Sequence, residues 1–361
     1  MTIKSVLLAS ALAAVAAVPA QAQSFFPECF APWDENTAQL DAVEPREGPY
    51  RIALVNGFAG NDWRIQMIQA ARAYVARPEV AEKIEEFVAV SVGNDVAAQI
   101  SAIENYVAAG FDAVLFIAVN PESFDAVIRN ANRDGTLLVS FDNIVFNDDH
   151  LIIDIDHGEY TRAKTQAVLD EMEASGTDAP LLWVRGLLGN ATESMMHDGF
   201  LEAIEGSGVE YVEVVGNWDT GVVQRVTADA IAAHGEFGGA VVQYGTMGAA
   251  QAMLDTEHPP IPVGSDTVNG SIQILAENGF SGTSIGSSPS ISAVAIAGAI
   301  AALEGEEVPQ RVGLPAPFAP SSSWNDGEAY FSDLPAGFDT ALGFAPCNIM
   351  FTPEELRSQE P

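Results

Sequence analysis

Basic residues are scarce in this chain of 361 residues, which has 15 Lys and Arg against 50 Asp and Glu and a formal net charge of −35. Nucleic acids bind proteins largely through Lys and Arg contacts with their phosphates. Anionic lipid surfaces attract basic clusters in the same way. The charge therefore disfavours both partners, and it favours high solubility.

Several signatures of enzymes and metal sites are also missing. No G-x-G-x-x-G follows the first expected strand, no P-loop occurs, and the five histidines lack H-x-x-x-H and H-E-x-x-H spacing. Residues 282–286 read G-x-S-x-G, but no helix follows Ser284 directly and no His follows His258, so the order of a hydrolase triad is absent. Residues 154–159, "DIDHGE", lack the acidic series of an EF-hand and are expected to form a solvated loop. We predict no catalysis, no metal and no cofactor.

Cysteine is rare, with Cys29 and Cys347 near the two ends of the chain. In an oxidising compartment the two could form a disulfide, and the alternative is a pair of free thiols. A zinc site is disfavoured, because two cysteines so far apart do not supply a ligand set.

No apolar run reaches the ~20 residues that a membrane-spanning helix needs. Lys4 precedes the run Val6–Val18, and the small residues around Ala22 follow it. This order is typical of a signal peptide, residues 1–22, cleaved near Ala22. The acidic, Pro-rich residues 23–49 are expected to form a leader segment over the surface.

From residue 50 onward, continuous apolar runs alternate with segments of helical periodicity. Strict alternation predicts parallel sheets joined by right-handed crossovers. The strands read as unbroken apolar runs, as sheets covered on both faces require. We therefore expect an α/β fold of two doubly wound parallel-sheet lobes joined by a hinge. The first lobe is expected to hold residues 50–146 plus about 290–311, and the second residues 147–289 plus about 312–350.

Polar and aromatic side chains recur where the expected strands end. Open α/β sheets bind ligands beyond the carboxyl ends of their strands. Aromatic rings can stack on the C–H face of a sugar, while carboxylates and amides hold its hydroxyls. The candidate ligand-binding residues are Asn61, Trp63, Arg64, Asp95, Asp142, Asn143, Glu193, Trp218, Tyr244, Asp266 and Ser287.

Other interpretations of these residues remain open. Asp95 and Asp266 could cap the helix that follows each of them, and Trp63 and Trp218 could belong to the core. Asp142 ends a strand with no strong helix after it, so capping explains it least well. It is the strongest single candidate.

Two stretches resemble the periplasmic sugar-binding proteins of bacterial ABC importers, in the ribose- and galactose-binding group. Residues 52–71, "IALVNGFAGNDWRIQMIQAA", are similar to that family's first strand, loop and helix. Residues 95–143, from "DVAAQISAIENYVAAG" to the closing "SFDN", follow its pattern more closely. The resemblance covers roughly residues 50–312 and implies the type I periplasmic binding protein fold.

The resemblance also implies roles for individual residues. Asn61, Trp63, Asp142, Trp218 and Asp266 match positions that contact sugar in the family, and Ser287 lies near another. Four positions depart from it: Arg64 stands where a second aromatic is common, Asn143 replaces an Arg, Tyr244 replaces an Asn, and Glu193 lies near a missing Arg. A site with few cations disfavours sugar acids and phosphates, and it could suit a neutral sugar, a polyol or a cationic ligand.

These observations predict a monomeric periplasmic solute-binding protein that closes its hinge on a neutral sugar or polyol and docks onto an ABC transporter permease. The alternative is a periplasmic sensor that presents its ligand to a receptor kinase or chemoreceptor.

Overall fold

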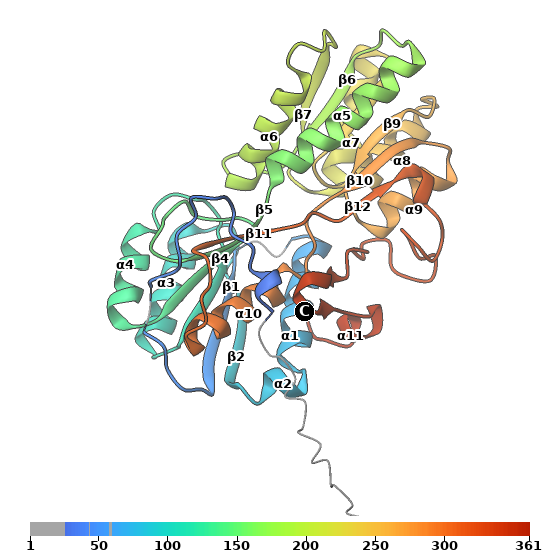
Figure 1. Cartoon of the computed structure of the whole chain (residues 1–361). Helices are drawn as coiled ribbons and strands as arrows, with labels where there is room; N and C mark the ends of the chain where they lie inside the picture. The colour runs from blue at the N-terminus through green and yellow to red at the C-terminus, as the bar shows by residue number, and fades with distance from the viewer. Residues whose placement is uncertain (1–25, 43, 58–59) are drawn as a thin grey trace, which may run out of the picture.

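The computed structural model describes residues 26–42, 44–57 and 60–361. The predicted signal peptide and its cleavage site lie outside these residues. The described chain forms two bodies, each built on a six-stranded sheet, and both are visible in Figure 1. The predicted α/β fold with two lobes is confirmed.

The first sheet is parallel throughout. Its strand order is β11-β5-β4-β3-β1-β2. The strands are β1 (Tyr50–Asn56), β2 (Ile84–Ser91), β3 (Ala113–Ile117), β4 (Leu137–Phe141), β5 (Leu151–Ile155) and β11 (Arg311–Leu314).

Helices cover both faces of this sheet. They are α1 (Asp62–Val75), α2 (Pro78–Ala81), α3 (Val96–Ala108), α4 (Asp125–Asp134) and α10 (Ile291–Glu304). Successive residues of a strand point to opposite faces. Ile52 and Leu54 of β1 accordingly belong to the core beneath α1 and α10, whereas Ala53 and Val55 belong to the core beneath α3 and α4.

The second sheet has the order β12-β10-β9-β8-β6-β7, and only the edge strand β12 is antiparallel to its neighbour among the described strands of this sheet. Its strands are β6 (Leu181–Arg185), β7 (Tyr211–Val215), β8 (Gly239–Val242), β9 (Pro262–Ser265), β10 (Ser281–Ile285) and β12 (Phe318–Pro320). Its helices are α5 (His157–Ser175), α6 (Ala191–Ile204), α7 (Thr220–His234), α8 (Thr246–Asp255) and α9 (Asn269–Glu277).

The lobe boundaries differ from the prediction in two strands. Residues 147–289 and 312–350 were expected in the second lobe, but β5 pairs with β4 and β11 pairs with β5, so both strands complete the first sheet. The connection between β4 and β5 contains no helix, and β5 pairs directly and in parallel with β4. The chain first crosses to the second sheet after Ile155.

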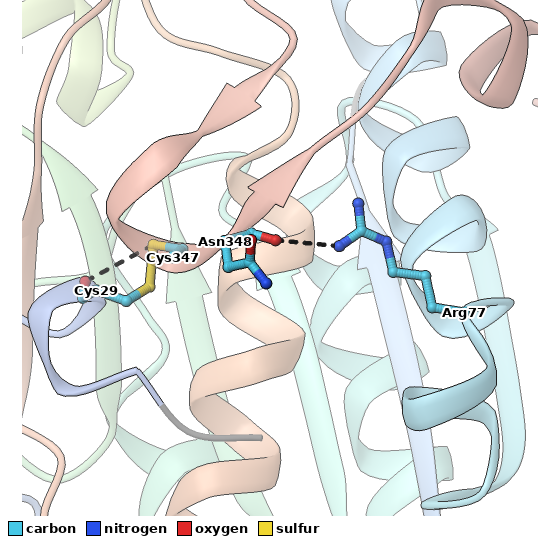
Figure 2. Close-up of a disulfide and its surroundings, with 4 residues drawn as sticks. All are labelled: Cys29, Arg77, Cys347 and Asn348. Atoms are coloured by element: carbon cyan, nitrogen blue, oxygen red, sulfur yellow. Dashed lines mark hydrogen bonds between the residues drawn. A yellow bond between two sulfur atoms is a disulfide. The ribbon is translucent and has the colours of Figure 1, made fainter. Parts of the chain in front are cut away.

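The C-terminal segment, residues 321–361, begins beside the second sheet and ends against the first (Figure 1). It contains η2 (Ser321–Ser323), β13 (Gly343–Phe344), η3 (Ala345–Cys347), β14 (Ile349–Met350) and α11 (Pro353–Arg357). Cys347 forms a disulfide with Cys29 at the end of η1 (Pro27–Cys29), as Figure 2 shows. Much of the stretch assigned to the second lobe thus packs on the first.

Candidate functional site

A cavity of about 70 Å³ lies between the two lobes. Its walls come from the carboxyl ends of strands in both sheets, the hinge segment after β10 and the C-terminal segment. The lining residues are Asn61, Trp63, Arg64, Asp142, Asn143, His157, Tyr160, Thr192, Met196, Trp218, Gln243, Tyr244, Asp266, Thr267, Gly286, Ser287 and Asp339.

The structure brings most of the residues proposed from the sequence to this cavity. They share a position just beyond the carboxyl end of a parallel strand, at the edge of each sheet where open α/β folds bind ligands. These residues are Asn61, Trp63, Arg64, Asp142, Asn143, Trp218, Tyr244, Asp266 and Ser287. Asp95 and Glu193 do not line the cavity.

Asp95 is exposed and serves as the N-cap of α3, where its carboxylate accepts a hydrogen bond from the Ala98 amide at 3.0 Å. Asp95 therefore caps the helix that follows it, which was the alternative interpretation of this residue. The strand before it, β2, is at the edge of the first sheet.

Glu193 is buried but already paired. Its two oxygens accept hydrogen bonds from Arg185 Nε and Nη2 at 2.7 and 3.0 Å. Gln243 Nε2 lies 3.4 Å from Glu193 Oε1. Glu193 thus pairs with Arg185 at the end of β6. It contacts the cavity only through Gln243, which does line it.

The first turn of α1 builds one wall. Asn61 is the N-cap of the helix and accepts a hydrogen bond from the Arg64 amide at 3.1 Å. Trp63 donates its indole N–H to the Ser287 carbonyl at 2.7 Å, which fixes the ring against the hinge. Arg64 is buried and donates from Nη1 to Asn56 Oδ1 at 3.0 Å. Burial lowers the pKa of Arg64 to about 10, while the nearby Asp142 opposes this shift, so the group stays cationic at neutral pH.

Asp142 and Asn143 follow β4 and face both lobes. Asp142 has a φ of 58°, and its Oδ1 accepts a hydrogen bond from Ser287 Oγ at 2.6 Å. Its carbonyl accepts from Thr192 Oγ1 of α6 at 2.8 Å, a contact across the cavity. With its amide oriented so that the oxygen faces Arg64 Nη2, at 2.6 Å, Asn143 donates to Asp142 Oδ2 at 3.0 Å. Arg64, Asn143 and Asp142 therefore form one continuous hydrogen-bonded chain.

The second lobe contributes Trp218 and Gln243, joined by a hydrogen bond from Trp218 Nε1 to Gln243 Oε1 at 3.1 Å. The same oxygen accepts from the Gly186 amide at 2.8 Å. Trp218 has a φ of 55°, an uncommon value for a bulky residue. The indole is therefore held by the Gln243 side chain, which the Gly186 amide after β6 fixes in turn.

We expect Gly186→Ala to displace Trp218. A Cβ at Gly186 would lie 2.0 Å from Trp218 Nε1 and 2.5 Å from Gln243 Oε1, so one of them must move. Overpacking of this kind costs about 1–3 kcal/mol of stability. The intrinsic tryptophan emission of the free protein should shift. In the control variant Gly221→Ala the nearest atom is 3.4 Å away, and the emission should not change. Unchanged emission in both variants would contradict the placement of Trp218.

Asp266 organises backbone groups at the end of β9. Its Oδ2 accepts from the amides of Gly245 and Thr246 at 2.8 and 3.0 Å, and its Oδ1 accepts from the Val268 amide at 3.1 Å. It therefore caps the preceding helix α8, not the helix that follows it. Burial, followed by the charges of Asp266 and Asp339, raises the pKa of the neighbouring Tyr244 well above its usual value, so this phenol stays protonated.

Sequence reasoning missed His157, which belongs to the segment predicted to be a solvated loop. That prediction is wrong, because Asp154 and Ile155 belong to β5 and His157 begins α5, with only 1% of its surface exposed. His157 Nδ1 lies 3.0 Å from the Tyr160 hydroxyl. Its Nε2 has no hydrogen-bond partner and lies 3.7 Å from Asp142 Oδ1 and 3.6 Å from Asp154 Oδ1.

The other missed lining residues are Tyr160, Thr192, Met196, Gln243, Thr267, Gly286 and Asp339. The strand-end rule could have found Gln243, which directly precedes Tyr244, and Thr267, which directly follows Asp266. Tyr160, Thr192 and Met196 lie within helices, and no local pattern marks them. Asp339 lies in a segment whose path the sequence leaves open.

Chemically, the cavity combines aromatic and thioether surfaces with many hydrogen-bonding groups. Trp63, Trp218 and Met196 supply the apolar faces, and carboxylates, amides and hydroxyls surround them. Among the described residues, no group of three or more His, Cys, Asp or Glu side chains is arranged to hold a metal ion. The arrangement suits reversible binding of a small molecule rich in hydroxyl groups.

Comparisons with known proteins agree with this geometry. The family model described as periplasmic binding protein domain matches residues 52–307. No curated protein sequence matches closely enough to count as a relative. An ABC transporter solute binding protein from Thermobispora bispora DSM 43833 is similar in structure, with a TM-score of 0.72, 23% identity, and coverage of 86% of this chain and 94% of that one.

Two further solved structures carry bound ligands. The arabinose transporter component from Shewanella sp. ANA-3, bound to L-arabinofuranose, has a TM-score of 0.68 and 18% identity over 76% of this chain and 93% of that one. A solute binding protein from Bacillus halodurans C-125, bound to myo-inositol, has a TM-score of 0.66 and 15% identity over 78% and 98%. At these identities the likeness establishes the fold.

Proposed function

Because the chain belongs to the periplasmic binding protein domain family, we propose that it captures a small neutral sugar or polyol between its lobes and delivers it to an ABC importer. The family consists of binding proteins, so no chemical transformation of the ligand is expected. Closure of the lobes would remove water from the cavity and strengthen the hydrogen bonds within it.

One observation supports this proposal above the others: the cavity presents hydroxyl-binding groups and aromatic faces from both lobes at once. Asp142 and Asn143 reach it from the first sheet, and Trp218 and Gln243 reach it from the second. A ligand that contacts both sets stabilises the closed arrangement, since it binds that arrangement more tightly than an open one.

The charges of the cavity favour a neutral ligand. Arg64 is the lining cation that stays charged, and its guanidinium already donates to Asn56 and Asn143. Asp142, Asp266 and Asp339 also line the cavity. An anionic sugar would meet these carboxyl groups without an uncommitted cation to offset them. The arabinofuranose and myo-inositol held by the two structural neighbours belong to the neutral class that we propose.

The family places the protein in the periplasm. Docking onto a permease of the inner membrane, a monomeric state and cleavage near Ala22 are parts of the proposal. Among the helices of the described residues, none has the length and apolarity to cross a bilayer. The sensor alternative has no observation in its favour.

The proposal is tested by titrating the mature protein with L-arabinose, D-galactose, D-ribose, D-allose, glycerol and myo-inositol, using calorimetry and tryptophan emission. We expect at least one of them to bind with micromolar or lower Kd and to change the emission, because Trp63 and Trp218 line the cavity. The five tryptophans of the chain are separated by repeating the titration with Trp63→Phe and Trp218→Phe. A cationic amine is titrated beside them, and binding of the amine alone, or of no compound, would contradict the proposal.

A further inference from the structure

The C-terminal segment, residues 321–361, follows the 52–307 range that the family model matches. It is a further connection between the lobes, in addition to the chain crossings after β5, around residue 287 and between β11 and β12. In Figure 1 the segment runs from the region of α9 in the second lobe to α11 beside α1 in the first. Because it spans both lobes, its residues are positioned by both.

The second lobe holds the middle of this segment. Asn269 of α9 donates from Nδ2 to the Phe331 carbonyl at 3.0 Å and accepts from the Phe331 amide at 2.7 Å. Thr267 donates from Oγ1 to Asp339 Oδ2 at 2.9 Å, and its carbonyl accepts from the Thr340 amide at 3.1 Å. These bonds fix residues 331–340 along the start of α9.

The first lobe holds the rest. Gln66 of α1 donates from Nε2 to the Asp339 carbonyl at 2.9 Å and accepts from the Asp339 amide at 2.8 Å. Further along, the Cys29–Cys347 disulfide and the bond from Arg77 Nη1 to the Asn348 carbonyl at 3.3 Å attach the segment to the first lobe (Figure 2). The main chain of Asp339 is thus bonded to one lobe and its side chain to the other.

Asp339 lines the ligand cavity with only 2% of its surface exposed. Its Oδ2 accepts from Thr267 Oγ1, and its Oδ1 accepts from the Ala341 amide at 2.8 Å. A carboxylate offers about four acceptor positions, so each oxygen retains one. Burial is the main cause that raises the pKa of Asp339 well above its usual value, and the protonated form could also donate. Either form can bond a ligand hydroxyl.

We propose that Asp339 is a specificity-determining contact for one hydroxyl of the bound sugar or polyol, carried into the cavity by the C-terminal segment. Gln66 is its positioning residue, because it holds the Asp339 backbone through two hydrogen bonds. This inference rests on the proposed function and adds to it a recognition group that lies beyond the matched family range.

The test uses the mature protein and the sugar or polyol of the panel above that binds best, together with its monodeoxy analogues. Asp339→Asn keeps the shape of the side chain and an acceptor for the Ala341 amide. We expect it to weaken binding of the parent compound about fivefold to tenfold, the usual effect of losing one hydrogen bond. The loss should vanish for the one analogue that lacks the contacted hydroxyl.

Asp333→Asn is the matched control, because Asp333 is an exposed carboxylate of the same segment. It should leave every affinity unchanged. Gln66→Met gives a second variant with the same expected dependence on the analogue, so the inference stays testable if Asp339→Asn fails to fold.

The outcomes separate the two proposals. If the wild-type protein binds none of the panel, the proposed function fails, and this inference with it. If the wild type binds but Asp339→Asn and Gln66→Met leave affinity unchanged, or weaken all analogues equally, only the role of Asp339 is overturned.

Discussion

The double variant Cys29→Ser/Cys347→Ser should lose about 2–5 kcal/mol of unfolding free energy, the usual cost of removing a native disulfide. The two cysteines are 318 residues apart in the sequence. A cross-link over so long a loop removes many conformations from the unfolded chain, and the stabilisation grows slowly with loop length. In the folded protein the bond joins η1 to η3 against the core of the first lobe.

Urea unfolding of the oxidised wild type, the reduced wild type and the double variant measures this effect. The reduced wild type and the variant should share a lowered midpoint, because both lack the same cross-link. Arg77 and the buried Leu356 still attach the C-terminal segment to the first lobe, so the fold should persist at low urea. A midpoint equal to that of the oxidised protein would show that the cross-link contributes nothing measurable.

Asp142→Ala should weaken binding of the best ligand by at least about tenfold, corresponding to roughly 1.5–3 kcal/mol for a hydrogen bond to a charged group. Asp142 is the carboxylate of the hydrogen-bonded chain, and it accepts from Ser287 on Oδ1 and from Asn143 on Oδ2. Its loss would also leave the buried Arg64 without the charge that opposes its desolvation.

The matched control is Asp95→Asn. Asp95 is the exposed N-cap of α3, and Asn caps helices about as well as Asp. Calorimetric titration should therefore give the wild-type Kd for this variant. Equal affinities for Asp142→Ala and the wild type would remove Asp142 from the binding site.

Asp95 and Asp142 also show how far strand-end reasoning reaches. Both follow an apolar strand of the first sheet, yet only Asp142 lines the cavity. A helix begins directly after Asp95, which supplies free backbone amides for its carboxylate to cap. No helix follows Asp142, so its side chain is free to face the cavity. Whether a helix follows therefore distinguished the capping carboxylate from the cavity-lining one, whereas the preceding strand did not.

Glu193 shows where local reasoning fails. Nothing in the sequence near residue 193 reveals that Arg185 would reach it, because that pairing depends on how α6 docks beside the end of β6. The same limit applies to β5, whose apolar run is compatible with either sheet. Its place was decided by hydrogen bonds to β4, which no periodicity can specify.

The order of apolar and polar residues by itself determined the alternation of strands and helices, the presence of two sheets and the polar, aromatic character of their facing edges. These features follow from local preferences and from burial, which act on residues close together in the chain. Only the tertiary structure decided that β5 and β11 complete the first sheet, that His157 is buried beside Asp142, and that residues 321–361 return to place Asp339 in the cavity. Each of these depends on how separate elements of the fold pack against one another, which local sequence preferences do not specify.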